Sequence, residues 1–313
     1  MFINKLIKGI KEKRSPVVVG FDPRLELIPN AIKDKYFGKY GKSFKAAAEA
    51  IIEFNKEIID NVYDIVPAIK PQIAFYEQYG IEGLKAYNET CEYASKKGLL
   101  IIGDIKRGDI GSTSKAYSNA HLGKTLVEDK LLEAFYSDSI TVNPYLGDDC
   151  LKEFVGDIEK YEKGMFVLVK TSNPTSSQLQ DLVVEGKKIY EKVAEMVDSW
   201  SKKYIGEYNY SSIGAVVGAT YPEEASSLRK LMPNSYFLVP GYGAQGGTAE
   251  DVIHSFNEDG LGAVVNSSRG ILYAYNKEEK WTEADYGRAA REAAINMKED
   301  INTTLEKHGK KYW

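Results

Sequence analysis

The sequence predicts an α/β protein folded as one (β/α)8 TIM barrel over residues 1–313, with short insertions. Eight short runs rich in β-branched residues alternate with longer helical patterns, which is the element order of such a barrel. Most of these runs are apolar at consecutive positions, as expected of parallel strands that are covered on both faces. No low-complexity linker divides the chain. An open, doubly wound sheet is the alternative, because periodicity does not establish closure.

The individual elements follow from local apolar patterns. Residues 1–16 predict a short amphipathic helix, because Phe2, Leu6 and Ile10 recur at steps of four. The predicted strands are residues 17–22, 65–70, 99–106, 139–142, 165–170, 213–218, 236–240 and 262–266. The helical patterns between and after them include residues 148–161, 222–231, 248–256 and 283–305. Insertions are expected near residues 26–45, 201–212 and 273–283.

Composition narrows the class of protein. The net charge is −4, which argues against a nucleic acid polymer or a membrane surface as partner, since both favour a basic excess. No apolar run approaches the roughly 20 residues of a membrane span, and the N-terminus is too charged for a signal peptide. The two cysteines, Cys91 and Cys150, cannot form a disulfide framework. We therefore expect a cytoplasmic protein.

The most informative segment is residues 103–113, GDIKRGDIGST. Residues two apart on a strand face the same way, so Asp104 and Lys106 should both point into the mouth of the barrel. Lys70 ends the preceding strand, and neighbouring parallel strands bring it close to Asp104. An isolated pair of this kind is most often a salt bridge at a strand end. Asp109 adds a further charge, and the alternating array favours a reactive site.

A glycine-rich loop, residues 240–247 (PGYGAQGG), follows the seventh predicted strand. Loops after the seventh and eighth strands commonly bind phosphate in these barrels, and glycines let backbone N–H groups approach the anion. A plain turn or linker is the alternative. Arg269 follows the eighth strand and supplies a cation suited to phosphate. The loop glycines are Gly241, Gly243, Gly246 and Gly247.

Residues 104–113, DIKRGDIGST, resemble the DxKxxDIxxT signature of the orotidine 5′-phosphate decarboxylase family, in its longer bacterial subfamily, type 2. The resemblance runs from FDPR at Phe21 to SSRG at Ser267. It implies conversion of orotidine 5′-monophosphate into uridine 5′-monophosphate and CO2, the last step of de novo UMP synthesis. It also implies a (β/α)8 barrel, a homodimer, and the use of no cofactor and no metal.

The resemblance also implies roles for the charged array. Asp22 and Lys70 resemble the family's contacts to the ribose hydroxyls. Asp104 resembles the acid beside the leaving carboxylate, and Lys106 the general acid that protonates C6 of the base. Two tasks for Asp104 stay open: it either crowds the substrate carboxylate or keeps Lys106 protonated and oriented.

Other positions match the family outside the array. Asp109 and Thr113 resemble residues that reach into the partner subunit's site, which would make the dimer necessary for catalysis. Gln245 and Arg269 occupy the places of the residues that bind the 5′-phosphate. The remaining matches surround the base, namely Pro240 and Ser172, with Thr171 as the alternative to Ser172.

Two rival functions follow from the same patterns. Sugar-phosphate decarboxylases and aldolases resemble this chain at DxKxxD but use Mg²⁺, held partly by a Glu on the second strand. This chain has Lys70 there, and an ammonium group would repel the ion. The second rival is a regulatory module that binds a nucleotide without turning it over.

Overall fold

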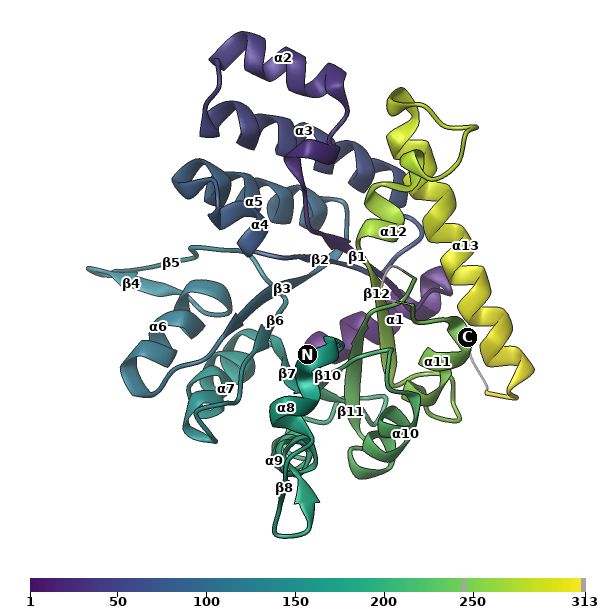
Figure 1. Cartoon of the computed structure of the whole chain (residues 1–313). Helices are drawn as coiled ribbons and strands as arrows, with labels where there is room; N and C mark the ends of the chain where they lie inside the picture. The colour runs from purple at the N-terminus through teal and green to yellow at the C-terminus, as the bar shows by residue number, and fades with distance from the viewer. Residues whose placement is uncertain (244–245, 311–313) are drawn as a thin grey trace.

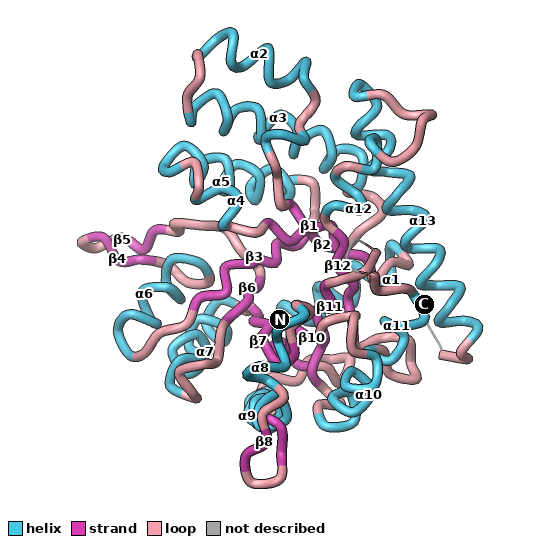
Figure 2. The backbone as a smooth tube through the Cα atoms, in the orientation of Figure 1, coloured by secondary structure: helices cyan, strands magenta, loops and turns pink. Residues whose placement is uncertain are grey.

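The computed structural model describes residues 1–243 and 246–310. Eight parallel strands close into a barrel with helices around it, which confirms the predicted fold and excludes the open sheet (Figures 1 and 2). In order around the barrel the strands are β1 (Val17–Phe21), β12 (Ala263–Ser267), β11 (Ser235–Pro240), β10 (Ser211–Val217), β7 (Gly164–Lys170), β6 (Ser139–Val142), β3 (Leu100–Arg107) and β2 (Ala68–Pro71). Each predicted strand therefore exists, with ends shifted by a few residues.

The first helix precedes the strands, and the later helices follow them on the outside of the barrel. The longer ones are α1 (Phe2–Lys13), α2 (Asn30–Tyr40), α3 (Phe44–Val62), α5 (Gly80–Lys96), α6 (Gly111–His121), α7 (Asp149–Tyr161), α9 (Ile189–Ser201), α10 (Pro222–Leu231) and α13 (Tyr286–Lys307). Four single-turn helices, α4 (Ala74–Glu77), α8 (Ser177–Gln180), α11 (Ala249–Val252) and α12 (Arg269–Leu272), lie in the connections. The predicted insertion near residues 26–45 contains α2, which packs on α3.

Two β-hairpins project from the barrel at positions where the sequence had indicated no strands (Figure 2). They pair β4 (Thr125–Val127) with β5 (Lys130–Leu132), and β8 (Val183–Val184) with β9 (Lys187–Lys188). Their strands are too short to give a clear periodic pattern. In the second hairpin Glu185 and Gly186 both have positive φ, as a two-residue type I′ turn requires.

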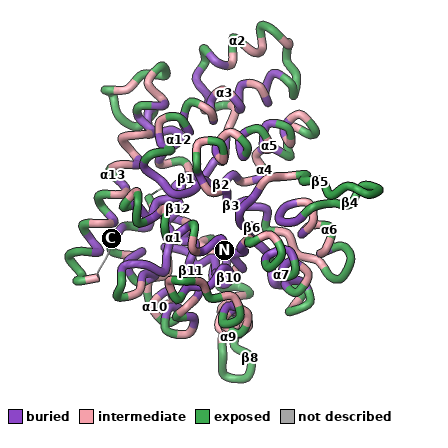
Figure 3. The backbone as a smooth tube through the Cα atoms, turned by 180° about the vertical axis from the view of Figure 1, so that it is seen from behind, coloured by how far each residue is buried: buried purple, intermediate pink, exposed green. Residues whose placement is uncertain are grey.

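Helix α1 closes the N-terminal end of the barrel, and Figure 3 shows it across the centre of the strand ring, seen from behind. The predicted amphipathic face is buried, including Phe2, Leu6 and Ile10. The ring of Phe2 meets that of Phe166, on β7, edge to face at 6.0 Å between centroids. This end of the barrel is therefore apolar and filled.

The strands turn alternate residues into the barrel, and this alternation positions the site. On β2, Ala68 packs with α1 in the apolar cluster, and Lys70 lies two residues nearer the mouth. On β12, Val264 belongs to the same apolar cluster, and Asn266 lies two residues nearer the mouth. The inward face thus changes from apolar to polar within one step of two residues.

None of the helices among the described residues has the length and apolar character needed to cross a membrane. Cys91 and Cys150 are both free thiols and both buried.

Candidate active site

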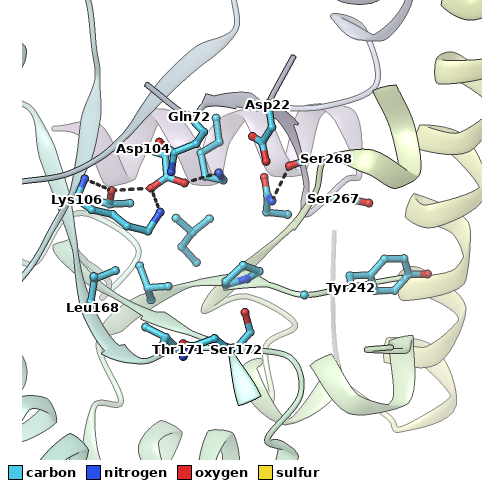
Figure 4. Close-up of a pocket in the computed structure, with 18 of the residues that line it drawn as sticks. Asp22, Gln72, Asp104, Lys106, Leu168, Thr171, Ser172, Tyr242, Ser267 and Ser268 are labelled. Atoms are coloured by element: carbon cyan, nitrogen blue, oxygen red, sulfur yellow. Dashed lines mark hydrogen bonds and ion pairs between the residues drawn. The ribbon is translucent and has the colours of Figure 1, made fainter. Parts of the chain in front are cut away.

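A cavity of about 470 Å³ opens at the C-terminal mouth of the barrel. Figure 4 shows Asp104 and Lys106 on one side of it, Asp22 and Ser268 above, and Thr171 and Ser172 below. Nine residues singled out from the sequence line it: Asp22, Lys70, Asp104, Lys106, Thr171, Ser172, Pro240, Gly241 and Arg269. The chain therefore brings together residues from six of its eight barrel strands or the loops that follow them.

Three members of the predicted charged array, Lys70, Asp104 and Lys106, come together in this cavity, whereas Asp109 does not line it. The Asp104 carboxylate accepts hydrogen bonds from two ammonium groups, with Lys70 Nζ 2.7 Å from Oδ2 and Lys106 Nζ 2.5 Å from Oδ1. The side chains of Asp104 and Lys70 are only 8% and 6% exposed, whereas that of Lys106 is 44% exposed. Asp104 and Lys70 therefore form a buried anchor, and Lys106 is the member of the array that remains open to a ligand.

The electrostatics of the buried pair keep both groups charged. Burial raises the pKa of Asp104, but the charges of Lys70 and Lys106 outweigh it and hold that pKa well below its ordinary value. For Lys70, burial lowers the pKa, and the charges of Asp104 and Asp22 more than compensate, so the net shift is upward. A carboxylate and an ammonium are thus the stable forms at neutral pH.

The backbone around Lys106 differs from the simple alternation that the sequence predicted. Strand β3 pairs with β6 in register at Gly103, and the pairing resumes only at Arg107, after an irregular stretch. Lys106 lies in this stretch with φ of 48°, a conformation that is uncommon for a residue other than glycine. Lys106 nevertheless reaches Asp104, so the predicted pair is present although regular strand geometry is not what creates it.

The loop after β7 offers two hydroxyl groups to the cavity. The Thr171 hydroxyl donates to Asn173 Oδ1 at 2.7 Å and accepts from Gln180 Nε2 at 2.7 Å. The Ser172 hydroxyl makes no hydrogen bond to the part of the chain that the structure describes. Ser172 is therefore the better placed of the two to bind a ligand, and the choice between them stays a prediction.

The glycine-rich loop, which follows β11, has the unusual backbone that its composition predicted. Gly241, Gly243 and Gly246 have positive φ, and a Cβ on Gly247 would lie 2.9 Å from the carbonyl oxygen of Gly241. Of these glycines, Gly241 lines the cavity together with Arg269, and Gly243 lines a neighbouring cavity. Gln245 lies outside the described residues.

Asp109 and Thr113 do not line the cavity of their own chain. Asp109, before the start of α6, is partly exposed, and Thr113, in the first turn of that helix, is exposed. Their position agrees with a role outside their own site, and that role stays a prediction.

Several residues of the cavity had no signal in the sequence. Thr141 on β6, Gln72 after β2 and Asn266 on β12 all line it. A threonine in a strand is ordinary, because β-branched residues suit strands in any case. Asn266 is only 6% exposed, and its Oδ1 has no hydrogen-bond partner among the residues that the structure describes. An inward amide at the end of an apolar strand was therefore the available clue.

Across residues 1–243 and 246–310, no group of three or more His, Cys, Asp or Glu side chains has an arrangement that suits a metal ion. The acid at the centre of the site, Asp104, has its two oxygens engaged by ammonium groups.

Comparisons with known proteins identify the family. Residues 15–284 match the orotidine 5′-phosphate decarboxylase / HUMPS family. The chain is 44% identical over 304 residues to the orotidine 5′-phosphate decarboxylase of Caldicellulosiruptor bescii, covering 97% of this chain and 99% of that protein. It is 46% identical over 303 residues to that of Rhodopirellula baltica, covering 96% and 98%. The solved structure of Leishmania donovani OMP decarboxylase matches with a TM-score of 0.72 at 30% identity, covering 97% and 98%. The chain therefore belongs to the orotidine 5′-phosphate decarboxylase family.

Proposed function

We propose that the Asp104–Lys70–Lys106 array carries out the decarboxylation of orotidine 5′-monophosphate, giving uridine 5′-monophosphate and CO2. The observation that carries this proposal is a buried carboxylate held between two ammonium groups, one of them open to a cavity that Arg269 also lines. The array suits a reaction in which negative charge develops on a bound ligand, because its exposed member is a cation.

In the proposed reaction the bond between C6 and the carboxylate carbon breaks, and its electron pair stays on C6. The pair lies in the plane of the ring, where the π system cannot delocalise it. Lys106 Nζ stabilises this charge and then donates a proton to C6, after which the amine regains a proton from water. A charge about 4 Å away at an effective dielectric near 20 contributes about 4 kcal/mol.

That contribution is smaller than the roughly 8–23 kcal/mol by which enzymes commonly lower a barrier. The rest must come from binding energy at groups remote from the reacting carbon. Arg269 and the glycine-rich loop are suited to the 5′-phosphate, Asp22 and Lys70 to the ribose hydroxyls, and Ser172 to the base. Pro240 lines the same cavity as Ser172.

Lys70 favours this function over that of the magnesium-dependent relatives. Its ammonium group is 2.7 Å from Asp104 Oδ2, where it would repel a divalent cation bound to the same carboxylate. Purified protein should lower the ultraviolet absorbance of orotidine 5′-monophosphate in a continuous assay. Binding of uridine 5′-monophosphate without any turnover would instead favour a regulatory nucleotide-binding module.

We also propose a homodimer in which Asp109 and Thr113 complete the site of the partner. The exposure of Thr113 and the partial exposure of Asp109 support it, and so does Ile110, an apolar side chain that lies between them in the sequence and is 56% exposed. A cytoplasmic location stays a prediction from the sequence.

Mixing two inactive variants tests the shared site. In a heterodimer of Lys106→Ala and Asp109→Asn subunits, one site lacks both groups and the other has both. Refolding the two together in equal amounts should restore about a quarter of the wild-type activity, since half the dimers are mixed and half their sites are intact. No recovery, with dimers present by light scattering, would contradict the arrangement.

A further inference from the structure

The irregular stretch of β3 holds Lys106 in place through a side chain of the neighbouring strand. Between the paired positions Gly103–Ile140 and Arg107–Val142, β6 advances by two residues and β3 by four. Two extra residues are thus accommodated on β3, and Lys106 takes its left-handed conformation there. Such a conformation persists only where surrounding contacts determine it.

Thr141 provides those contacts. It is the residue of β6 between the two paired positions, it is 1% exposed, and it lines the cavity. Its Oγ1 accepts the backbone N–H of Lys106 at 3.0 Å and lies 2.8 Å from Asp104 Oδ1 (Figure 4). A threonine hydroxyl therefore replaces the main-chain carbonyl that regular pairing would have offered to Lys106.

The direction of both hydrogen bonds is fixed by chemistry. The N–H of Lys106 can only donate, so the Thr141 oxygen accepts there and its own proton points to the carboxylate. Asp104 is ionised, because its pKa is held low, and so it can only accept. One hydroxyl thus connects the backbone of Lys106 to the same Oδ1 that binds the Lys106 ammonium at 2.5 Å.

The result is a closed ring of contacts. It runs from the backbone of Lys106 through Thr141 to Asp104 and returns through the Lys106 side chain. A lysine has four rotatable side-chain bonds, and an exposed ammonium would otherwise sample many positions. Fixing the backbone and the carboxylate from one atom limits where Lys106 Nζ can lie relative to a ligand in the cavity.

A hydroxyl on this strand is not enough by itself. Ser139 lies two residues before Thr141 on the same inward face of β6 and is fully buried. Its hydroxyl has no hydrogen-bond partner among the described residues. The Thr141 hydroxyl is therefore hydrogen-bonded to the array and the Ser139 hydroxyl is not, so Ser139 offers a matched control.

We propose that Thr141 is a positioning residue that sets Lys106 and Asp104 in their reactive arrangement. This inference rests on the proposed roles of those two residues. It predicts that loss of the Thr141 hydroxyl slows the chemical step and leaves nucleotide binding largely intact, because the hydroxyl is fully engaged within the protein. Positioning errors of this kind have large effects on rate.

The test compares four variants with the wild-type protein as a full-length chain. Thr141→Val removes the hydroxyl and keeps the shape, and Ser139→Ala removes the unconnected hydroxyl. Thr141→Ser and Thr141→Ala both lack the methyl group and differ from each other only in the hydroxyl. Initial rates with orotidine 5′-monophosphate give kcat and KM, and titration with uridine 5′-monophosphate gives Kd and reports a folded site.

We expect Thr141→Val to lower kcat at least tenfold, with KM and the Kd of uridine 5′-monophosphate changed less than threefold. Thr141→Ser should retain kcat within threefold, Thr141→Ala should match the Val variant, and Ser139→Ala should resemble the wild type. If the Val variant does not fold, the Ser and Ala variants decide, since they differ from each other only in the hydroxyl. Equal kcat for Ser and Ala, or a Val variant with the kcat of Ser139→Ala, would overturn the proposal.

A failure of the broader function is distinguishable from these outcomes. In that case the wild-type protein itself would not turn over orotidine 5′-monophosphate, whereas failure of the positioning role leaves the wild type active and the Thr141 variants unimpaired.

Discussion

The two ends of the barrel use the same inward-facing strand positions for opposite purposes. At the closed end Ala68 and Ile102 pack with α1 in an apolar cluster. Two residues further along the same strands, Lys70 and Asp104 form an ion pair. Burial of apolar surface stabilises the fold, whereas buried charges are tolerated only when they are paired. The closed end therefore contributes stability, and the open end holds charge that a ligand can use.

Lys106→Ala at the open end should have the largest effect. Turnover should fall about a thousandfold or more, because loss of about 4 kcal/mol of stabilisation corresponds to roughly three factors of ten. The free energy of unfolding should change by less than about 1 kcal/mol, since this side chain is 44% exposed. Orotidine 5′-monophosphate assays and urea unfolding measure the two quantities. Turnover near that of the wild type would refute the role of Lys106.

Phe2→Ala at the closed end should show the reverse. It removes a buried ring that packs on Phe166, so the free energy of unfolding should fall by about 3–5 kcal/mol. The kcat of the folded protein should stay near the wild-type value. Lys8→Ala on the exposed face of α1 is the control and should change stability by less than about 0.5 kcal/mol. A large drop in kcat for the Phe2 variant would contradict the division of roles between the closed end and the open end of the barrel.

Arg269→Ala separates the phosphate end of the cavity from the charged array. Binding of uridine 5′-monophosphate should weaken about 10- to 100-fold, because hydrogen bonds to charged groups contribute roughly 1.5–3 kcal/mol. Binding of uridine, which has no phosphate, should hardly change. Arg288→Ala, on the exposed part of α13, serves as control for the loss of one positive charge. Calorimetric titration would contradict the assignment if both ligands lost affinity equally.

The acid dependence of stability tests the buried pair. The pKa of Asp104 is lower in the folded protein than in the unfolded chain, so its contribution is complete above about pH 4 and is lost as pH falls below it. The difference in unfolding free energy between wild type and Asp104→Asn should narrow by about 1.4 kcal/mol for each pH unit below that point.

Urea unfolding at several pH values from about 2 to about 7 measures how the difference in unfolding free energy between the wild type and Asp104→Asn changes with pH. Asp129→Asn, which changes an exposed acid in the turn between β4 and β5, is the control for the loss of one negative charge. A constant difference for Asp104→Asn would mean that the ion pair does not persist in the folded protein.

Of these changes, removal of metal ions should have the smallest effect on kcat. Treatment with EDTA followed by desalting should leave kcat unchanged, since the proposed chemistry uses the ammonium of Lys106. Restoration of the rate by added Mg²⁺ after such treatment would instead favour the chemistry of the magnesium-dependent relatives.

The sequence by itself determined the order of the elements and most of the charged site. Consecutive apolar runs specify strands that are covered on both faces, and a single step of two residues carries Asp104 to the mouth. The unusual backbone of the glycine-rich loop could also be predicted, because glycine adopts the positive φ found at Gly241 and Gly243 far more readily than other residues do. These features are local, because they depend on the backbone geometry of residues that are close together in the sequence.

Tertiary structure alone decided closure of the barrel, the register between β3 and β6, and the partners of each hydroxyl. Thr141 and Ser139 are similar residues on one strand, yet only Thr141 meets the displaced backbone of Lys106. The alternation of side chains along a regular strand predicted the Asp104–Lys106 pair correctly. It does not explain the pair fully, because Lys106 lies in a stretch of β3 where that alternation is interrupted. Such contacts join residues 35 positions apart, and which residues meet across that separation depends on how whole strands pack rather than on any local pattern.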